Sequence, residues 1–304
     1  MVESESNPKP AAKNRSKRKR LLRWFAFSLA AFMGFTGIAA WVVAGSIVAP
    51  RPRPAGDPPP GLGARSVEFE SDSGAKIAGW VTSPDGPRGV LLLLHGIHGS
   101  RRSMVPRAIQ FHDAGYATVL IDLRCHGESS GDRITLGDRE REDVRAAVTF
   151  TKQVYPDLPL GIVGVSLGGA ATLMASPLPF DALVLESVYP DIDRAVRNRV
   201  SARLGVLSEL VAPLLLWQLG PRLDVSRDEL RPIDRISSVG APVFIISGEE
   251  DLHTTKGETR ELYDAAAEPK RLWLIESAGH EDLFRVAPDE YSERVIDFFD
   301  RHLK

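Results

Sequence analysis

The chain has 304 residues, of which 43% are hydrophobic and 26% charged, so it can bury a full core and does not resemble a disordered or fibrous protein. The net charge of −2 hides an asymmetry, because residues 1–23 carry a charge of +6 and the rest of the chain carries −8. The acidic balance after residue 23 argues against a body that binds nucleic acid.

An uncharged, mostly apolar stretch follows the basic segment. It runs from Phe25 to Ala49, and as a helix it is long enough to cross a bilayer with some tilt. We expect residues 1–23 to be a cytoplasmic tail and residues 24–49 a single-pass signal anchor in the cell membrane, with all that follows on the extracytoplasmic side. Two alternatives are a cleaved signal peptide, with Val42 and Ala44 as a weak cleavage site, and a buried core helix.

Residues 50–64 are rich in proline, with six prolines between Pro50 and Pro60. This composition favours extended polyproline II, and we expect a stiff linker between the anchor and a domain over residues 65–304. A single cysteine, Cys125, excludes a disulfide within the chain, so cysteine usage does not support the extracytoplasmic location.

Short apolar runs alternate with helical patterns after residue 65. Residues 67–70 and 76–81 predict an antiparallel hairpin, and buried parallel strands are expected at 89–94, 117–121, 160–165, 182–185, 243–246 and 272–275. Helices are expected at 103–114, 136–154, 167–175, 255–267 and 289–302. Together these elements predict an α/β fold with a mostly parallel sheet. Residues 190–240, with an apolar patch over 210–217, predict a small helical cap.

Ser166 lies in the run Gly164-Val165-Ser166-Leu167-Gly168, which ends an expected strand and begins an expected helix. A sharp strand-to-helix turn with glycines on either side exposes a serine at the carboxyl end of the sheet, as a nucleophile requires. The alternative is a glycine-rich turn with an incidental serine.

A serine hydroxyl needs a base and an acid that orients the base. Asp251 and His280 each follow a later strand, so both are expected at the same end of the sheet as Ser166. Glu249 and Glu250 compete with Asp251 for the role of acid and are better explained as loop charges. As the base, His253 is too close in sequence to Asp251, and His302 lies at the end of the last helix.

Stabilising the oxyanion of acyl transfer requires fixed N–H donors. We expect the main-chain N–H groups of Leu167 and Ile97 to form this oxyanion hole, since glycines flank Ile97 in the loop His95-Gly96-Ile97-His98-Gly99. The two histidines of this loop could also be a metal pair, but no acidic or cysteine partner has ligand spacing nearby, so no metal is expected.

These motifs together resemble the α/β-hydrolase superfamily, closest to serine hydrolases of the monoacylglycerol lipase and serine aminopeptidase type. The resemblance covers residues 65–304 and rests on five segments: His95-Gly96, residues 122–129, residues 164–168, residues 248–251 and Gly279-His280. It implies an eight-stranded sheet, a Ser-Asp-His triad and no cofactor. Cys125 departs from the family, where glycine is common in that turn.

The expected function is hydrolysis of a small-molecule acyl ester or thioester through an acyl-enzyme. Two alternatives stay open: cleavage of an amide or peptide by the same groups, and a silent pseudo-hydrolase that only binds a ligand or partner.

Overall fold

The computed structural model describes the main chain of residues 11–304 and the side chains from residue 17 onward. The chain divides into two units at Gly45 and Ser46, and each is described by itself. The expectation of a basic tail over residues 1–23 lies partly outside the described residues. Within the described part, the basic residues from Lys17 to Arg23 already belong to a helix.

The first unit consists of α1 (Ala11–Val48), a 38-residue helix whose last residues enter the second unit. Large apolar side chains such as Phe25, Phe35 and Ile38 are exposed on it. Residues Lys17–Val48 are apolar and long enough to cross a membrane, and so is the stretch Ile192–Leu223 of the second unit.

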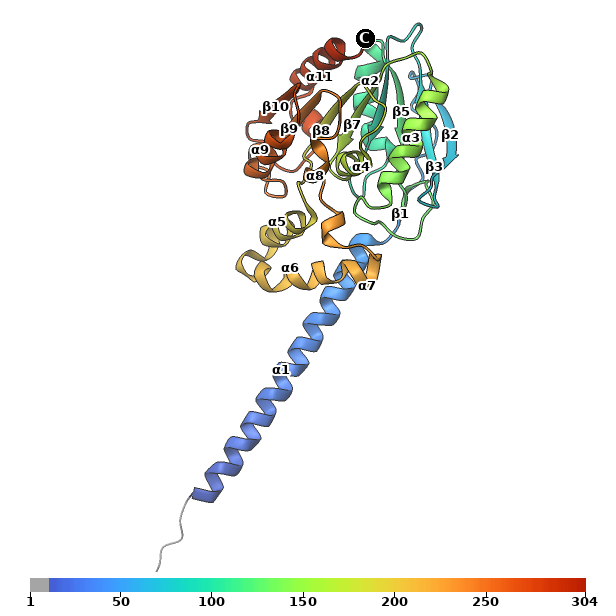
Figure 1. Cartoon of the computed structure of the whole chain (residues 1–304). Helices are drawn as coiled ribbons and strands as arrows, with labels where there is room; N and C mark the ends of the chain where they lie inside the picture. Colours follow the sequence, from blue (N-terminus) through green and yellow to red (C-terminus); the bar gives the residue numbers. More distant parts are fainter. Residues whose placement is uncertain (1–10) are drawn as a thin grey trace, which may run out of the picture. The chain divides into compact units, whose positions relative to one another are not determined.

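The second unit is built on one eight-stranded sheet (Figure 1). Its strands are β2 (Arg65–Glu70), β3 (Lys76–Thr82), β4 (Val90–Leu94), β5 (Ala117–Ile121), β7 (Leu160–Val165), β8 (Ala182–Glu186), β9 (Val243–Gly248) and β10 (Lys270–Ile275). Their spatial order is β10-β9-β8-β7-β4-β5-β3-β2. All pairs from β10 to β5 are parallel, whereas β3 pairs antiparallel with both β5 and β2. This confirms the expected α/β-hydrolase sheet, which is mostly parallel and has eight strands.

Helices cover both faces of the sheet and form two cores. On one face pack α3 (Glu140–Val154), α4 (Leu167–Ala175) and α9 (Lys256–Ala265). On the other pack α2 (Val105–Asp113), α10 (Leu283–Val286) and α11 (Pro288–His302). Strand β4 is an example of a strand that contributes to both cores. Its residues Leu92 and Leu94 belong to the first core, and Leu91 and Leu93 belong to the second. A strand buried on both faces must be apolar at every position.

Helix α3 begins later than the sequence pattern predicts. We expected a helix from residue 136, but it starts at Glu140. Leu136 and Gly137 have φ angles of 58° and 109°, which no right-handed helix accommodates. The buried carboxylate of Glu140 instead accepts hydrogen bonds from the N–H groups of Thr135 (2.8 Å) and Gly137 (2.7 Å), which fixes this turn.

The proline-rich segment does not stand free as a spacer. Strand β1 (Arg51–Pro52) pairs with strand β6 (His126–Gly127) in a short parallel ladder. Ala55 is buried, and its N–H donates to Glu128 at 2.9 Å. Leu62 belongs to the second core. The segment expected as a stiff linker is therefore part of the second unit, which begins at Ser46.

A group of helices lies between β8 and β9. It comprises α5 (Ile192–Leu204), the 3₁₀ turn η2 (Gly205–Leu207), α6 (Ser208–Trp217), α7 (Leu219–Leu223), the 3₁₀ turn η3 (Arg227–Glu229) and α8 (Ile233–Ile236). Figure 1 shows α5, α6 and α7 grouped together outside the sheet layers. Because this insertion begins just after β8, it starts at the carboxyl end of the parallel strands. We call α5 to α7 the cap.

Gly168 permits the close approach of α4 to β4. A Cβ atom built on it would lie 2.7 Å from Leu94 Cβ and 2.8 Å from the Leu94 carbonyl oxygen, closer than such atoms pack. Gly257 occupies the same second position of α9, but a Cβ there would meet nothing within 4 Å.

We predict that Gly168→Ala lowers the free energy of unfolding by about 1–3 kcal/mol, because the added methyl group must push backbone atoms apart. Gly257→Ala should leave stability unchanged or raise it by up to about 1 kcal/mol, since alanine favours a helix over glycine. Urea denaturation of both variants in detergent checks this. Equal stability of the two variants would contradict the packing argument.

Candidate active site

Ser166 occupies a strained turn between β7 and α4. Its φ and ψ angles are 47° and −107°, a conformation that a residue with a side chain rarely adopts. Two main-chain hydrogen bonds hold it there: its N–H donates to the carbonyl of Glu186 at 2.8 Å, and its carbonyl accepts the N–H of Ala170 at 2.9 Å. The side chain stands at the carboxyl end of β7 and is 5% exposed.

Asp251 and His280 are joined by a hydrogen bond. His280 Nδ1 lies 2.8 Å from Asp251 Oδ2, and Asp251 Oδ1 accepts the N–H groups of His253 (2.7 Å) and Thr254 (2.8 Å). Burial disfavours the charged carboxylate, but the bond to His280 and the two N–H donors outweigh it and lower the pKa of Asp251. A carboxylate that stays ionised can fix the tautomer and orientation of the imidazole.

Three of the four competing side chains have contacts of their own. Glu249 forms an ion pair with Lys256. His302 packs against Phe298, with ring centroids 4.8 Å apart. The His253 ring packs against His280 at 4.8 Å, and burial together with nearby positive charge lowers its pKa. Among the acids and histidines that we weighed, Asp251 and His280 are therefore the two that the structure pairs.

The expected nucleophile and base are not joined in the same way. Among the described residues, the Ser166 hydroxyl makes no hydrogen bond to His280, although both residues follow strands at the same end of the sheet. Hydrogen bonds of this kind are often long in an enzyme without substrate and shorten when substrate binds.

The loop after β4 lies against Ser166. A Cβ atom built on Gly96 would be 3.5 Å from Ser166 Cβ, an ordinary van der Waals distance, so Gly96, directly before Ile97, lies close to the serine. Leu167 is the first residue of α4, so its N–H has no partner within the helix. These are the two positions from which we expected oxyanion donors.

Two buried histidines hold this loop through main-chain contacts. His126 Nε2 accepts the N–H of His98 at 3.0 Å, and its Nδ1 lies 2.8 Å from the Arg124 carbonyl. His95 Nε2 accepts the N–H of Leu123 at 3.1 Å. Burial lowers the pKa of His95 to about 4 and that of His126 to about 3, so both rings are neutral at pH 7.

The histidines of the loop are not arranged as a metal pair. His95 Nδ1 lies 2.7 Å from the Gly96 carbonyl, and His98 Nε2 lies 2.8 Å from the Ile47 carbonyl, so each ring contacts the main chain. In the part of the chain that the structure describes, no group of three or more His, Cys, Asp or Glu side chains could hold a metal ion.

Comparison with known proteins identifies the family. The family model described as serine aminopeptidase, S33, matches residues 85–231. An uncharacterised protein of Mycobacterium tuberculosis (strain H37Rv) is 30% identical over 225 residues, which cover 72% of this chain and 73% of that protein. The chain belongs to the α/β hydrolases and is similar to the serine aminopeptidases of the S33 family.

Other α/β hydrolases with named activities are also similar. A monoacylglycerol lipase of Mycolicibacterium smegmatis is 32% identical over 182 residues, covering 57% of this chain and 61% of the lipase. The crystal structure of a Pyrococcus furiosus esterase superposes with a TM-score of 0.71 at 24% identity, over 84% of this chain and 99% of the esterase. The second similarity establishes the fold, and the family model is that of a hydrolase.

The sequence did not indicate which polar groups contact the segments that form this candidate site. His126, Glu186, Arg107 and Asp282 are among them. Glu186 had a usable signal, because a carboxylate directly after the apolar run 182–185 must be buried at a strand end and so needs a partner. Arg107 had no such signal in the sequence, because an arginine within an amphipathic helix usually faces solvent.

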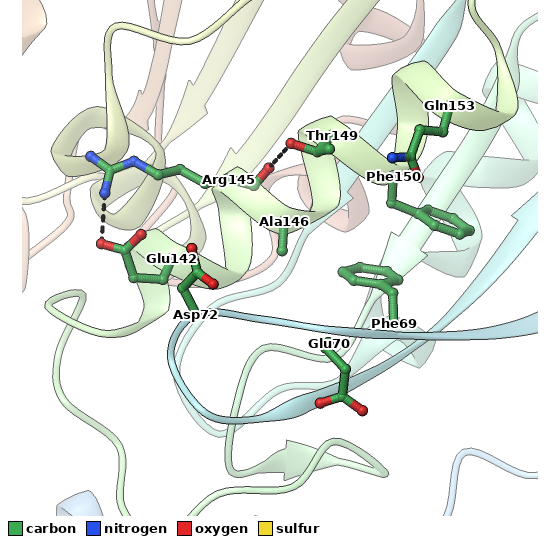
Figure 2. A pocket seen from close by; sticks show the side chains of 9 residues that line it. All are labelled: Phe69, Glu70, Asp72, Glu142, Arg145, Ala146, Thr149, Phe150 and Gln153. Atoms are coloured by element: carbon green, nitrogen blue, oxygen red, sulfur yellow. Dashed lines mark hydrogen bonds and ion pairs between the residues drawn. The ribbon is translucent and has the colours of Figure 1, made fainter.

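A hollow of about 300 Å³ lies away from these residues, between β2 and α3 (Figure 2). Phe69 and Phe150 stack on one side of it with ring centroids 4.6 Å apart. On the other side, Arg145 pairs with Glu142 at 2.6 Å. None of the predicted site residues lines this hollow, so we do not assign it to the active site.

The neutral histidine under the loop predicts a stability that depends on pH. Because the folded-state pKa of His126 is about 3, against 6.5 for an unperturbed histidine, the unfolded chain binds a proton more readily below pH 6.5. The contribution of His126 to stability is therefore present above pH 6.5 and is lost as the pH falls toward 3.

We predict that His126→Gln, which keeps an acceptor for the His98 N–H, reduces the loss of stability on acidification. Urea denaturation measured from pH 7.5 to 4 checks this. Asp143 acts in the opposite sense, because burial raises its pKa to about 6, but it is present in both proteins and cancels in their difference. Parallel pH curves for the two proteins would show that His126 is not the titrating group.

Proposed function

We propose that the protein is a membrane-anchored serine esterase in which Ser166, Asp251 and His280 form the catalytic triad. The observation that carries this proposal is the Asp251–His280 hydrogen bond, placed at the same sheet end as a serine held in a strained strand-to-helix turn. The family and the esterase with the same fold support it.

In the proposed reaction, Ser166 Oγ attacks the acyl carbonyl carbon while its proton passes to His280 Nε2. The carbonyl oxygen becomes an oxyanion next to the N–H groups of Ile97 and Leu167. As the tetrahedral intermediate collapses, His280 donates the proton to the leaving alcohol, which leaves an acyl-enzyme. Water attacks this ester with His280 again as the base, and His280 returns the proton to Ser166 Oγ as the acid product leaves. Asp251 keeps Nδ1 of His280 protonated throughout.

The cap favours an apolar acyl ester as the substrate. It exposes large apolar side chains, with exposed fractions of 89% for Val206, 71% for Leu210 and 68% for Trp217. Helix α5 is also tied to the loop that carries Asp251, since Asn198 Nδ2 donates to the His253 carbonyl at 3.3 Å and to Glu258 at 2.8 Å. An apolar cap fixed beside the acid is suited to an acyl chain.

A second candidate is cleavage of an amide or peptide bond. The family model is named for serine aminopeptidases, and the same triad and oxyanion donors would serve an amide carbonyl. A panel of p-nitrophenyl esters of increasing acyl length, run beside aminoacyl p-nitroanilides, separates the two. We expect the esters to be the faster substrates.

For catalysis, we predict that Ser166→Ala abolishes covalent labelling by a fluorophosphonate probe and all ester hydrolysis above background. Asp251→Asn should still fold and lower kcat by about 10³- to 10⁴-fold, because the histidine loses its tautomer and orientation. Glu250→Gln is the control from the same loop and should keep wild-type rates. If the wild-type protein is not labelled at Ser166, the chain is a pseudo-hydrolase and the proposal is wrong.

We further propose that α1 anchors the protein in a membrane. The second unit, from Ser46 to Lys304, is called the hydrolase unit below, and we propose that it lies on the extracytoplasmic side. Residues 25–49 carry no charge, and eight Lys and Arg residues precede them within residues 1–23. Basic residues of this kind stay on the cytoplasmic side. The exposure of so many large apolar side chains on α1 to water would be unfavourable, which supports a membrane location for this helix.

We predict that the full-length protein stays in the membrane fraction after alkaline carbonate extraction, and that protease added to intact cells digests the hydrolase unit. The intact mass distinguishes the anchor from a cleaved signal peptide. A mature chain that begins near Gly45 would indicate cleavage, and it would leave the unit from Ser46 onward whole. Protection of the hydrolase unit in intact cells, lost on permeabilisation, would reverse the topology.

A further inference from the structure

A buried arginine joins two segments that carry the proposed catalytic residues. Arg107, on α2, is 2% exposed. Its Nε and Nη2 atoms donate to the Glu186 carboxylate at 3.0 and 2.6 Å, and Nη2 also donates to Asp282 at 2.7 Å. The Tyr291 hydroxyl donates to the same Glu186 carboxylate.

Glu186 lies next to the nucleophile. It is the last residue of β8, in register with Val165 of β7, and its main-chain carbonyl accepts the N–H of Ser166 at 2.8 Å. That hydrogen bond is one of the two that hold Ser166 at a φ of 47°. A displacement of Glu186 would therefore move the turn that presents the serine.

Asp282 lies next to the base. It follows His280 by two residues and stands at the N-cap of α10, where its carbonyl accepts the N–H of Arg285 at 2.9 Å. The short segment between β10 and α10 thus carries His280 and is attached to Arg107 through Asp282 at its far end. Asp251 binds the ring of His280 directly, whereas Arg107 binds Asp282 in the same segment of chain as His280.

The composition of this cluster suits a positioning role better than a stabilising one. Burial opposes the charge of Arg107, but Glu186, Tyr291 and Asp282 outweigh it and raise the arginine pKa. A buried ion pair of this kind is often no more stabilising than apolar residues of the same volume. The planar guanidinium, however, can donate to two carboxylates in fixed directions at once, which a lysine cannot.

We propose that Arg107 is a positioning residue that fixes His280 relative to Ser166 by clamping Asp282 to Glu186. This inference rests on the proposed triad. Arg107 need not touch the substrate, and its effect passes through the geometry of the base and the nucleophile. Misplacement of a catalytic group by about 1 Å can cost on the order of 10²-fold in rate.

The test uses Asp282→Asn in the full-length protein in detergent, with Asp297→Asn as the matched control. Asp297 lies on α11, is 36% exposed against 32% for Asp282, and also pairs with arginines, Arg271 and Arg301. We expect Asp282→Asn to lower kcat for a p-nitrophenyl ester by about 10- to 100-fold, with KM within twofold and a Tm close to that of the control. Fluorophosphonate labelling should slow by the same factor yet reach full stoichiometry.

Arg107→Lys provides a second variant, which keeps the charge but loses one of the two directed contacts, and we expect the same drop in kcat. The proposal is overturned if kcat of Asp282→Asn stays within twofold of the control, or if kcat falls only in proportion to the fraction of protein that can be labelled. If the wild type shows no Ser166-dependent labelling, the triad and the clamp both fail. Normal wild-type labelling with an unaffected Asp282→Asn overturns the clamp alone.

Discussion

The turn at Ser166 constrains the rest of the hydrolase unit. A residue with a side chain at a φ of 47° is stable only where its surroundings hold it. Here α4 must start directly above β7, so Gly164 and Gly168 pack against backbone, and a Cβ on Gly164 would lie 2.6 Å from Gly169 Cα. The carbonyl of Glu186 on the neighbouring strand fixes the serine N–H. The position of the proposed nucleophile thus depends on strand register as well as on local sequence.

Several buried polar side chains near the candidate site bind main-chain groups or an opposite charge. Asp251 accepts two N–H groups besides His280, and Asp122 accepts the N–H groups of Arg101 (2.6 Å) and Glu128 (2.9 Å). His126 stays neutral and serves as an acceptor for the His98 N–H. Such groups cost free energy unless they are satisfied, and once satisfied they fix loops that have no secondary structure of their own.

The hydrolase unit extends further toward the N-terminus than the motifs alone indicate. Main-chain bonds from Arg51 and Arg53 to Cys125 and Gly127, at 2.6 and 2.8 Å, attach the proline-rich segment to the turn after β5. Proline cannot form the N–H side of a sheet, yet Pro52 takes part in a two-residue ladder through its neighbours. The segment that follows α1 is therefore held by the domain, and Cys125, at a φ of 61°, lies at this junction.

The sequence was enough to predict the alternation of strands and helices, the mostly parallel sheet and the candidates Ser166, Asp251 and His280, because apolar runs and flanking glycines report local geometry directly. One of its errors was local, because the positive φ angles at Leu136 and Gly137 shortened α3. The sequence already favoured Asp251 over Glu249 and Glu250, but the Asp251–His280 hydrogen bond appears only in the folded chain. The same is true of the contacts by which Arg107 joins Glu186 to Asp282. These contacts link residues far apart in the chain, and no periodicity in the sequence records which buried charge will face which.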